Sequence, residues 1–302
     1  MRETEVLVTM PVKNPATNRA TPKFVFAGKV DGIEGDVIDD WKSTDDPHKF
    51  ISRRAIAFQA ELYALALKYV KRTITGIRYR LITKPGIRFC NKDADLQAYE
   101  DRCVEWIEAE PDRLFDHSLP LNAGRLVQAR HYLWECCQRI LDCRRNARWL
   151  PNSGACDAWG RQCPYLPLCE CMAANADPTW IIEDQFEVAE NTHSELGGYT
   201  NKRCVVTQSS LGCLCLCELR YYWRYERGLR KPRTSIDAAW LGSAMHVGLE
   251  HFVAGRLEGA YAAIDEWREH NPVLGEDVRK QDQEIAKARA MTRAAAGRWI
   301  GG

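Results

Sequence analysis

The chain has 302 residues, of which 45% are hydrophobic, so it is long enough to bury one large core or two smaller ones. Its 42 basic and 41 acidic residues leave a formal net charge of +1, and any phosphate binding must therefore depend on local patches. No uninterrupted apolar stretch could cross a bilayer and no apolar signal segment opens the chain, which predicts a cytoplasmic protein with no membrane partner.

Strand-like segments are concentrated in the first third of the chain. Four stretches predict strands on their alternating or apolar patterns, namely 4–12, 23–31, 36–42 and 77–82. Gly32 and Gly35 lie between the second and third of these. We therefore expect the chain to reverse there in a hairpin with a short irregular loop.

An acidic pair and a lysine make this hairpin the strongest candidate site. Because successive side chains of a strand point to opposite faces, Asp40 and Lys42 share one face, while Asp39 and Trp41 share the other. Asp31 ends the preceding strand and can lie beside Asp40. Hard divalent cations such as magnesium prefer carboxylate oxygens, which can hold them against a phosphate. With Lys42 to orient the attacking water or neutralise developing charge, the pattern indicates a metal-dependent phosphodiesterase site.

Residues 52–72 are rich in helix formers, and their apolar spacing predicts an amphipathic helix. Gln59 and Tyr63 are four residues apart, so they share a helix face and can reach the same ligand. Taken alone, such a pair is typical of an ordinary amphipathic helix, and an Asp-x-Lys at a strand end is typical of a solvated edge. Their order and the strand–turn–strand–helix setting favour a functional site.

In this order, Asp31, Asp40-x-Lys42 and Gln59-x-x-x-Tyr63 resemble the core of the PD-(D/E)XK nuclease superfamily, specifically its RecB-like branch. The resemblance implies an α/β fold with a restriction-endonuclease-like core, in which helices flank a small mixed β-sheet. It implies that Asp31 and Asp40 bind magnesium or manganese and that Lys42 assists catalysis. It also implies that Gln59 and Tyr63 contact DNA near the site.

The chain holds 13 cysteines, and in a reducing compartment clustered cysteines suggest metal binding before disulfides. The sharpest cluster consists of Cys156, Cys163 and Cys169, in a stretch rich in Gly, Pro and aromatic residues that predicts a loop. A cubane iron–sulfur cluster needs a fourth thiolate, which can come from far away in sequence. A zinc site is the chief alternative, since tetrahedral sulfur ligation suits both metals.

Residues 211–225 supply the fourth candidate, because Cys217 lies four residues before Tyr221. This segment resembles the opening helix of the iron–sulfur members of the same nuclease branch, which include AddB-type helicase–nuclease subunits and CRISPR-associated exonucleases. The resemblance implies a Cys-rich subregion with a 4Fe-4S cluster bound by Cys156, Cys163, Cys169 and Cys217. Cys213, on the same predicted helix face, and Cys215 are the fallbacks, and Cys171 is ambiguous. The remaining cysteines are expected to be small apolar packing residues: Cys90, Cys103, Cys136, Cys137, Cys143 and Cys204.

His246 stands four residues after Gly242, and the pair resembles the Gly-x-x-x-His motif of the RecB-like branch. The resemblance implies that His246 is a further ligand of the catalytic metal. A lone histidine on a helix is more often exposed or satisfied within the protein. Here its position after a Cys-Tyr-Tyr segment favours a ligand.

Basic and aromatic residues are interleaved between these two motifs. They are Arg220, Arg224, Arg227, Arg230, Lys231 and Arg233, with Tyr221, Tyr222, Trp223 and Tyr225. Such an arrangement suits backbone contacts and base stacking on a single strand of nucleic acid. The alternative is a solvated amphipathic helix with a buried aromatic side, which is the expected state of most of these rings.

The order of the motifs differs from that of the family, in which the Cys-Tyr-Tyr helix and the His motif come first and the three-Cys loop comes last. One interpretation is a circularly permuted domain, in which the cluster ties the family's natural ends together. The other is the back part of one copy joined to the front part of a second. We divide the chain into core strands, the Gln-Tyr helix and the three-Cys loop (1–180), a linker (181–203) and a helical region that completes the nuclease domain (204–302).

The sequence therefore predicts a metal-dependent DNA exonuclease acting in recombination, repair or phage DNA processing. Its DNA partner is expected to be single-stranded or a strand end, with a second copy of the chain or a recombination protein as a further partner. Two alternatives stay open: a catalytically inactive DNA-end-binding module and a zinc-clamped structural protein.

Overall fold

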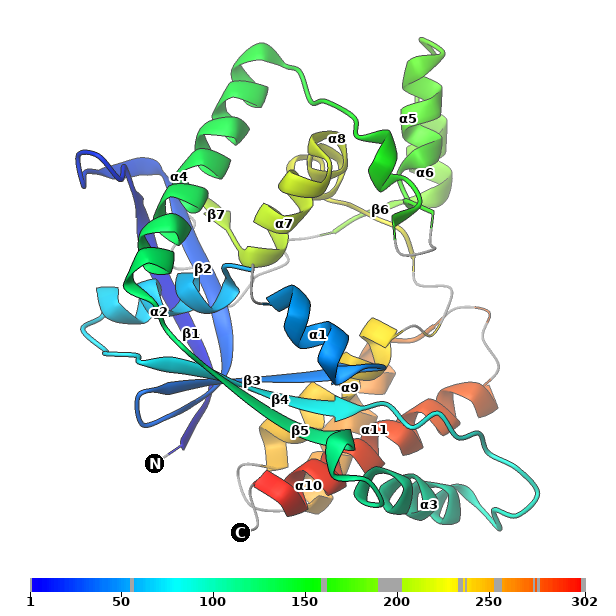
Figure 1. The fold of residues 1–302 in the computed structure, drawn as a ribbon. Coiled ribbons are helices and arrows are strands. Elements are labelled where there is room, and N and C mark those ends of the chain that lie inside the picture. Colours follow the sequence, from blue (N-terminus) through cyan, green and yellow to red (C-terminus); the bar gives the residue numbers. More distant parts are fainter. Residues whose placement is uncertain are drawn as a thin grey trace.

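The computed structural model describes residues 2–54, 57–158, 162–189, 203–232, 236, 238–252, 257–273, 275 and 278–299. Within this part of the chain, a six-stranded mixed sheet lies at the centre (Figure 1). Its strands are β1 (Arg2–Lys13), β2 (Ala20–Glu34), β3 (Val37–Thr44), β4 (Gly76–Thr83), β5 (Leu114–Pro120) and β7 (Cys204–Val206).

The first five strands are neighbours in the order β1-β2-β3-β4-β5, and β7 pairs with β2. The pairs β3–β4 and β2–β7 are parallel, and the other neighbouring strands are antiparallel. This mixed α/β architecture fits the expected restriction-endonuclease-like fold. All four predicted strands are confirmed as β1 to β4, whereas β5 and β7 were not predicted.

The β2–β3 hairpin forms as predicted, but its reversal lies at Gly35 and Asp36, with Gly32 inside β2. Gly35 has a φ of +63°, a left-handed conformation that glycine adopts without a steric cost. The ladder between β2 and β3 covers only three residue pairs and ends with Gly32 opposite Asp39. If this register is continued by one residue pair beyond the ladder, Asp31 of β2 lies opposite Asp40 of β3.

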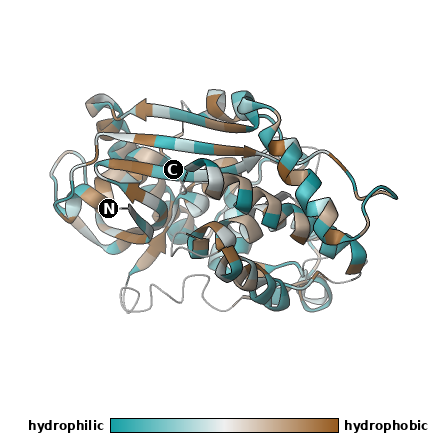
Figure 2. Ribbon diagram, turned by 90° about the horizontal axis from the view of Figure 1, so that it is seen from below, coloured by the Kyte–Doolittle hydropathy of each residue, from teal (hydrophilic) through white to brown (hydrophobic). Residues whose placement is uncertain are grey.

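Helices cover both faces of the sheet (Figure 1). One apolar core joins the sheet to α1 (Pro47–Arg54), α2 (Gln59–Tyr69), α4 (Ala123–Asn146) and α7 (Gln208–Leu216). A second core joins it to α3 (Leu96–Glu108), α9 (Ala238–Phe252), α10 (Leu257–His270) and α11 (Val278–Trp299). Seen from below, the helices carry both apolar and polar segments, as expected for elements with one side against the sheet (Figure 2).

The predicted helices are only partly correct in extent. The single helix expected over 52–72 is two helices, α1 and α2, with residues 55–56 outside the described part of the chain. The helix predicted within 121–149 is confirmed as α4, and the helical pattern of 237–299 resolves into α9, α10 and α11. None of the described helices combines the length and the apolar character that crossing a membrane requires.

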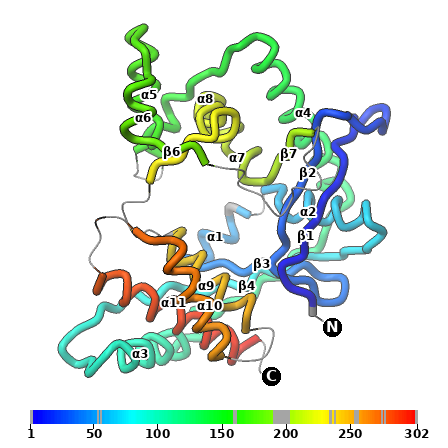
Figure 3. Tube along the Cα trace, turned by 180° about the vertical axis from the view of Figure 1, so that it is seen from behind, coloured from blue at the N-terminus to red at the C-terminus, as the bar shows by residue number. Residues whose placement is uncertain are grey.

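A smaller region carries the clustered cysteines and lies apart from α9, α10 and α11 (Figure 3). It consists of α5 (Leu166–Ala173), α6 (Thr179–Gln185), α8 (Glu218–Tyr221) and a two-stranded sheet of β6 (Glu187–Val188) and β8 (Leu229–Arg230). Its core is small and includes Tyr165, Leu168 and Trp223. The segment expected as a linker, 181–203, begins within α6 and includes β6, and its residues 190–202 lie outside the described residues.

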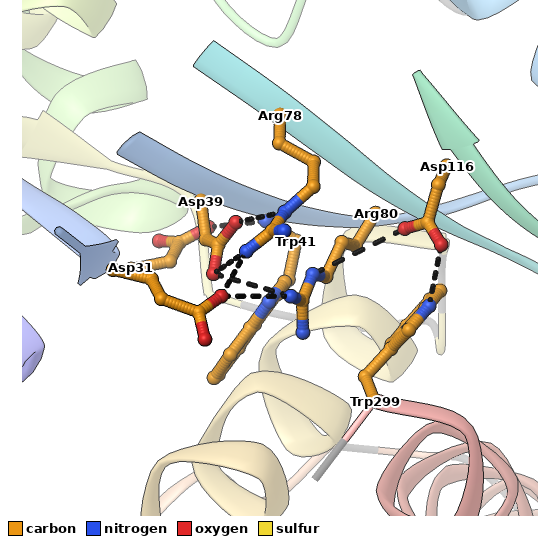
Figure 4. Close-up of polar contacts among 8 residues, drawn as sticks. Asp31, Asp39, Trp41, Arg78, Arg80, Asp116 and Trp299 are labelled. Atoms are coloured by element: carbon orange, nitrogen blue, oxygen red, sulfur yellow. Dashed lines mark hydrogen bonds and ion pairs between the residues drawn. The ribbon is translucent and has the colours of Figure 1, made fainter. Parts of the chain in front are cut away.

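The last helix is tied to the central sheet by polar contacts (Figure 4). Trp299 Nε1 donates a hydrogen bond to Asp116 Oδ2 at 3.0 Å, and the Arg80 guanidinium lies 5.6 Å from the centre of the Trp299 ring. Arg78 Nε donates to Asp39 Oδ1 at 2.7 Å, and Arg80 Nη2 lies 3.6 Å from Asp39 Oδ2. Asp39 is therefore held in ion pairs with two arginines of β4, one of which, Arg80, also lies against Trp299 of α11.

Candidate active site

The predicted carboxylates and lysine of the hairpin meet at the end of the β2–β3 ladder. Lys42 Nζ lies 3.1 Å from Asp31 Oδ2 and 3.0 Å from Asp40 Oδ1, so its ammonium bridges the two carboxylates. The backbone N–H of Trp41 donates a hydrogen bond to Asp31 Oδ2 at 2.8 Å. Asp40 and Lys42 therefore share a face, as the alternation of the strand predicted.

His246 reaches the same place from α9, more than two hundred residues later in the chain. Its Nδ1 atom lies 3.9 Å from Asp31 Oδ2. Gly242, one turn earlier, packs on β3, where a Cβ atom would lie only 2.9 Å from Ser43 Oγ. The absence of a side chain at Gly242 thus allows α9 to approach the strand closely enough to deliver the imidazole.

The pKa values of the two carboxylates, Asp31 and Asp40, are shifted in opposite directions. Burial acts to raise the pKa of Asp31, but the Lys42 ammonium, His246 and the Trp41 N–H outweigh it and lower that pKa below its ordinary value. Burial raises the pKa of Asp40, helped by the neighbouring charge of Asp31. Asp40 Oδ2 is buried and accepts no hydrogen bond from the described residues. The site therefore contains one well-stabilised carboxylate and one with an unsatisfied oxygen.

Lys42 and His246 differ in charge state at neutral pH. Burial disfavours the Lys42 ammonium, but Asp31 and Asp40 outweigh this and raise its pKa, so the lysine stays charged. Burial lowers the pKa of His246 to about 4, and the nearby Lys42 charge acts in the same direction. Its imidazole is therefore neutral at pH 7, the form in which histidine binds metals.

Gln59 and Tyr63 project from α2 toward the same site. Gln59 Nε2 donates a hydrogen bond to Tyr63 Oη at 3.3 Å, and burial raises the pKa of Tyr63 with a contribution from the Asp40 charge. The Tyr63 ring packs on Gly28 of β2, where a Cβ atom would come within 2.5 Å of the ring. Arg54 Nη1 donates to Gln59 Oε1 at 3.1 Å, a contact that the sequence analysis missed because no motif includes Arg54.

As the side chains stand, the described part of the chain has no group of three or more His, Cys, Asp or Glu side chains arranged to hold a metal ion. Within the hairpin site the reason is visible in the geometry, because the Lys42 ammonium occupies the position between the two carboxylates. A cation bound by Asp31 and Asp40 would have to replace these contacts of Lys42.

The four cysteines predicted as cluster ligands line one cavity of about 510 Å³. Cys156 and Cys163 lie in irregular segments, but Cys169 lies within α5, so the prediction of a loop is wrong at this residue. The backbone N–H groups of Asn152 and Arg220 approach Cys217 Sγ at 3.4 and 3.5 Å. Burial raises the pKa of Cys169 to about 11, with the neighbouring thiols adding to the shift.

Cys217 lies between α7 and α8 in an extended conformation, with φ −164° and ψ 119°. The expectation of one continuous helix, with Cys213 and Cys217 on the same face, is therefore wrong. Cys215, the other fallback, instead lies against Cys136, with the two Sγ atoms 3.7 Å apart. Cys90 is exposed, so its expected packing role is also wrong.

The rings of the basic and aromatic segment are buried only in part. Tyr221 and Trp223 are buried, whereas Tyr222 and Tyr225 are partly exposed, so the expectation that most of these rings pack inside the protein holds for two of the four. Arg220 lines the cysteine cavity, and the guanidinium of Arg230 lies 5.7 Å from the Tyr225 ring. Arg233 lies outside the described residues.

Comparison with known protein families gives one match. The sequence profile of the PD-(D/E)XK nuclease superfamily matches residues 205–301, about a third of the chain, which contain Cys217 and His246. No curated protein and no solved structure matches the chain. The match indicates a nuclease, and nucleases of this superfamily typically act on DNA and use magnesium or manganese.

Proposed function

We propose that the protein is a metal-dependent DNA nuclease that hydrolyses phosphodiester bonds from a strand end, in recombination, repair or phage DNA processing. The observation that carries the proposal is the meeting of Asp31, Asp40 and Lys42 with His246, an imidazole from the distant end of the chain. A purely structural cluster has no need of a neutral, half-buried imidazole beside two carboxylates. The superfamily match supports the same conclusion independently, because it covers the part that carries His246.

The chemistry of these donors fits a hard divalent cation. Asp31 and Asp40 would hold magnesium or manganese together with His246, and the unsatisfied Asp40 Oδ2 is the atom with the strongest need of a partner. A bound cation supplies Lewis-acid polarisation of a phosphoryl oxygen. Lys42 then carries the remaining positive charge, which stabilises negative charge on the phosphoryl oxygens or orients the attacking water. Gln59 and Tyr63 position the DNA strand.

The cysteine cavity supports a 4Fe-4S cluster held by Cys156, Cys163, Cys169 and Cys217. Four thiolates of one zinc ion crowd around a single atom, whereas the thiolates of a cubane cluster bind separate iron atoms and lie farther apart. The four cysteines share the lining of one cavity, yet as the described side chains stand no three of them are grouped to hold a single metal ion, which favours a cluster over zinc. The N–H groups near Cys217 would stabilise its thiolate.

One circularly permuted domain is the organisation that best accounts for these contacts. β7, from the later part of the chain, pairs with β2, and His246 approaches Asp31 within the same molecule. In a join of two incomplete copies, each half would instead need a neighbouring molecule. The division into 1–180, a linker and 204–302 then separates segments of one domain rather than two units.

Cleavage assays with magnesium or manganese test the function. Labelled single strands and duplexes with defined ends are incubated with the protein, and loss of nucleotides from one end is expected only with metal. Asp40→Asn should abolish this activity, while Asp36→Asn should retain it, since Asp36 lies at the hairpin turn and bonds Thr75 instead. Binding of DNA ends without metal-dependent cleavage would identify the inactive end-binding module instead.

Metal analysis after anaerobic purification tests the cluster. About four irons per chain with a broad visible absorbance are expected. One zinc per chain and no iron would favour the zinc-clamped alternative.

A further inference from the structure

A cavity of about 530 Å³ lies beside the candidate active site, at the end of β3. Thr44, two residues beyond Lys42 on the same strand, lines it together with Phe50 and Arg54 of α1 and with Ala57. The cavity borders the site through Arg54, whose guanidinium bonds Gln59 at 3.1 Å. A ligand in the cavity would therefore adjoin the carboxylates and the lysine of the hairpin.

The basic side chains around this cavity differ in whether a carboxylate neutralises them. Lys49 Nζ lies 3.3 Å from Asp46, and Lys84 Nζ lies 3.6 Å from Asp45. Arg54 forms no ion pair with a carboxylate among the described residues, and the one hydrogen bond of its side chain to them is the contact with the neutral Gln59. Its charge acts on Asp40 only from beyond ion-pair distance. The guanidinium is thus the cation whose charge remains available to an anionic ligand.

The surroundings of Arg54 also suit a flat ligand group. Its guanidinium lies 4.5 Å from the centre of the Phe50 ring, and such a planar cation can stack on an aromatic ring or on a nucleobase. Phe50 and Ala57 supply apolar wall, while the guanidinium supplies donors in a fork that matches a phosphate.

We propose that this cavity binds the unpaired nucleotide next to the phosphate that is cleaved, with Arg54 contacting its phosphate and the substrate a single strand of DNA. The proposal rests on the nuclease function above and specifies its substrate. A base paired in a duplex is stacked between its neighbours and cannot enter a side pocket, whereas an unpaired base can.

The test measures binding of a fluorescent single-stranded oligonucleotide without divalent metal, so that no cleavage occurs. Arg54→Gln is expected to weaken binding about tenfold, the size of one charge-assisted phosphate contact. It should also reduce the salt dependence by about 0.7 in the slope of log affinity against log salt concentration. Arg54→Lys should recover part of the loss. Lys49→Gln is the matched control, because it removes a cation from the same cavity that Asp46 already neutralises, and a change of less than about twofold is expected.

Cleavage kinetics and duplex binding give the second readout. In Arg54→Gln, KM for single strands should rise about tenfold with kcat nearly unchanged, because a flanking contact acts on binding. Blunt duplex binding should be weak and equal in the variant and the original protein. Unchanged affinity in Arg54→Gln, with the melting temperature retained, overturns the proposal, as does tighter binding of blunt duplex than of single strands. If the original protein binds strands through Arg54 but never cleaves them, the nuclease function fails while the binding site stands.

Discussion

The carboxylate site and the cysteine cavity differ in how the protein holds them. The first lies between two large apolar cores, and its charged groups have partners in place: Lys42 bridges Asp31 and Asp40, and Trp41 fixes Asp31 through the backbone. The second lies over a small core, and burial raises the pKa values of its thiols Cys156 and Cys169. The charged site is thus held by contacts among the chain's own residues, whereas the cysteine region is the one that the proposed cluster would stabilise.

The largest effect is expected from removing the bridging ammonium. Lys42→Met leaves the buried Asp40 carboxylate facing the partly buried Asp31 carboxylate and removes the charge proposed to stabilise the transition state, so cleavage should fall by about a thousandfold. Initial rates with magnesium measure this effect, and the iron content should not change. A loss of iron in Lys42→Met would contradict the independence of the two regions.

The next effect should come from the cysteine cavity. Cys169→Ser is expected to remove the visible absorbance and to lower the stability of α5 and α6 by several kcal/mol, because binding of the cluster is coupled to folding. Limited proteolysis and iron analysis measure it. Cys171→Ser, two residues later in α5 and not lining the cavity, is the matched control and should keep its iron.

A smaller effect should follow from crowding Tyr63. Gly28→Ala brings a Cβ atom within 2.5 Å of the Tyr63 ring, so the ring must move, at a cost of about 1–3 kcal/mol in unfolding free energy. Cleavage should fall as Tyr63 leaves its position near the carboxylates. Gly86→Ala, where a Cβ atom meets nothing within 4 Å, should be nearly silent in both the thermal melt and the cleavage assay.

The smallest expected effect is on folding stability and concerns an ion pair outside both regions, Asp93 with Arg102. Hydrogen bonds from Arg102 lower the pKa of Asp93 to about 2, from an ordinary value of 3.8. The pair therefore stabilises the folded state fully above the ordinary value, and this contribution is lost as the pH falls through about 2. Asp93→Asn should lower the melting temperature slightly at pH 7. A difference that persists unchanged near pH 2 would show that the pair acts through packing rather than charge.

Local patterns predicted the hairpin well, because strand alternation alone fixes which face Asp40 and Lys42 share. The position of His246 beside these residues could not be predicted from local patterns. It depends on α9 packing against β3 through the contact of Gly242 with Ser43, residues that are far apart in the sequence. Only the motif resemblance pointed to it.

Other misses have equally specific causes. The division into α1 and α2 was hidden by a continuous run of helix-forming residues. β5 carries three consecutive polar residues, Asp116, His117 and Ser118, and lies at the sheet edge against β4, so its strand pattern was weak. The extended conformation of Cys217 could not be anticipated, because the helical periodicity of its neighbours runs through it.

The approach of His246 to Asp31 from the later part of the chain has a consequence for synthesis on the ribosome. Asp31, Asp40 and Lys42 emerge early, but His246 follows roughly two hundred residues later, a delay on the order of ten to forty seconds at ordinary translation rates. Any hydrolysis that requires the imidazole cannot begin on a nascent chain. Under the proposed function, no unfinished chain could cut nucleic acid before its translation ends.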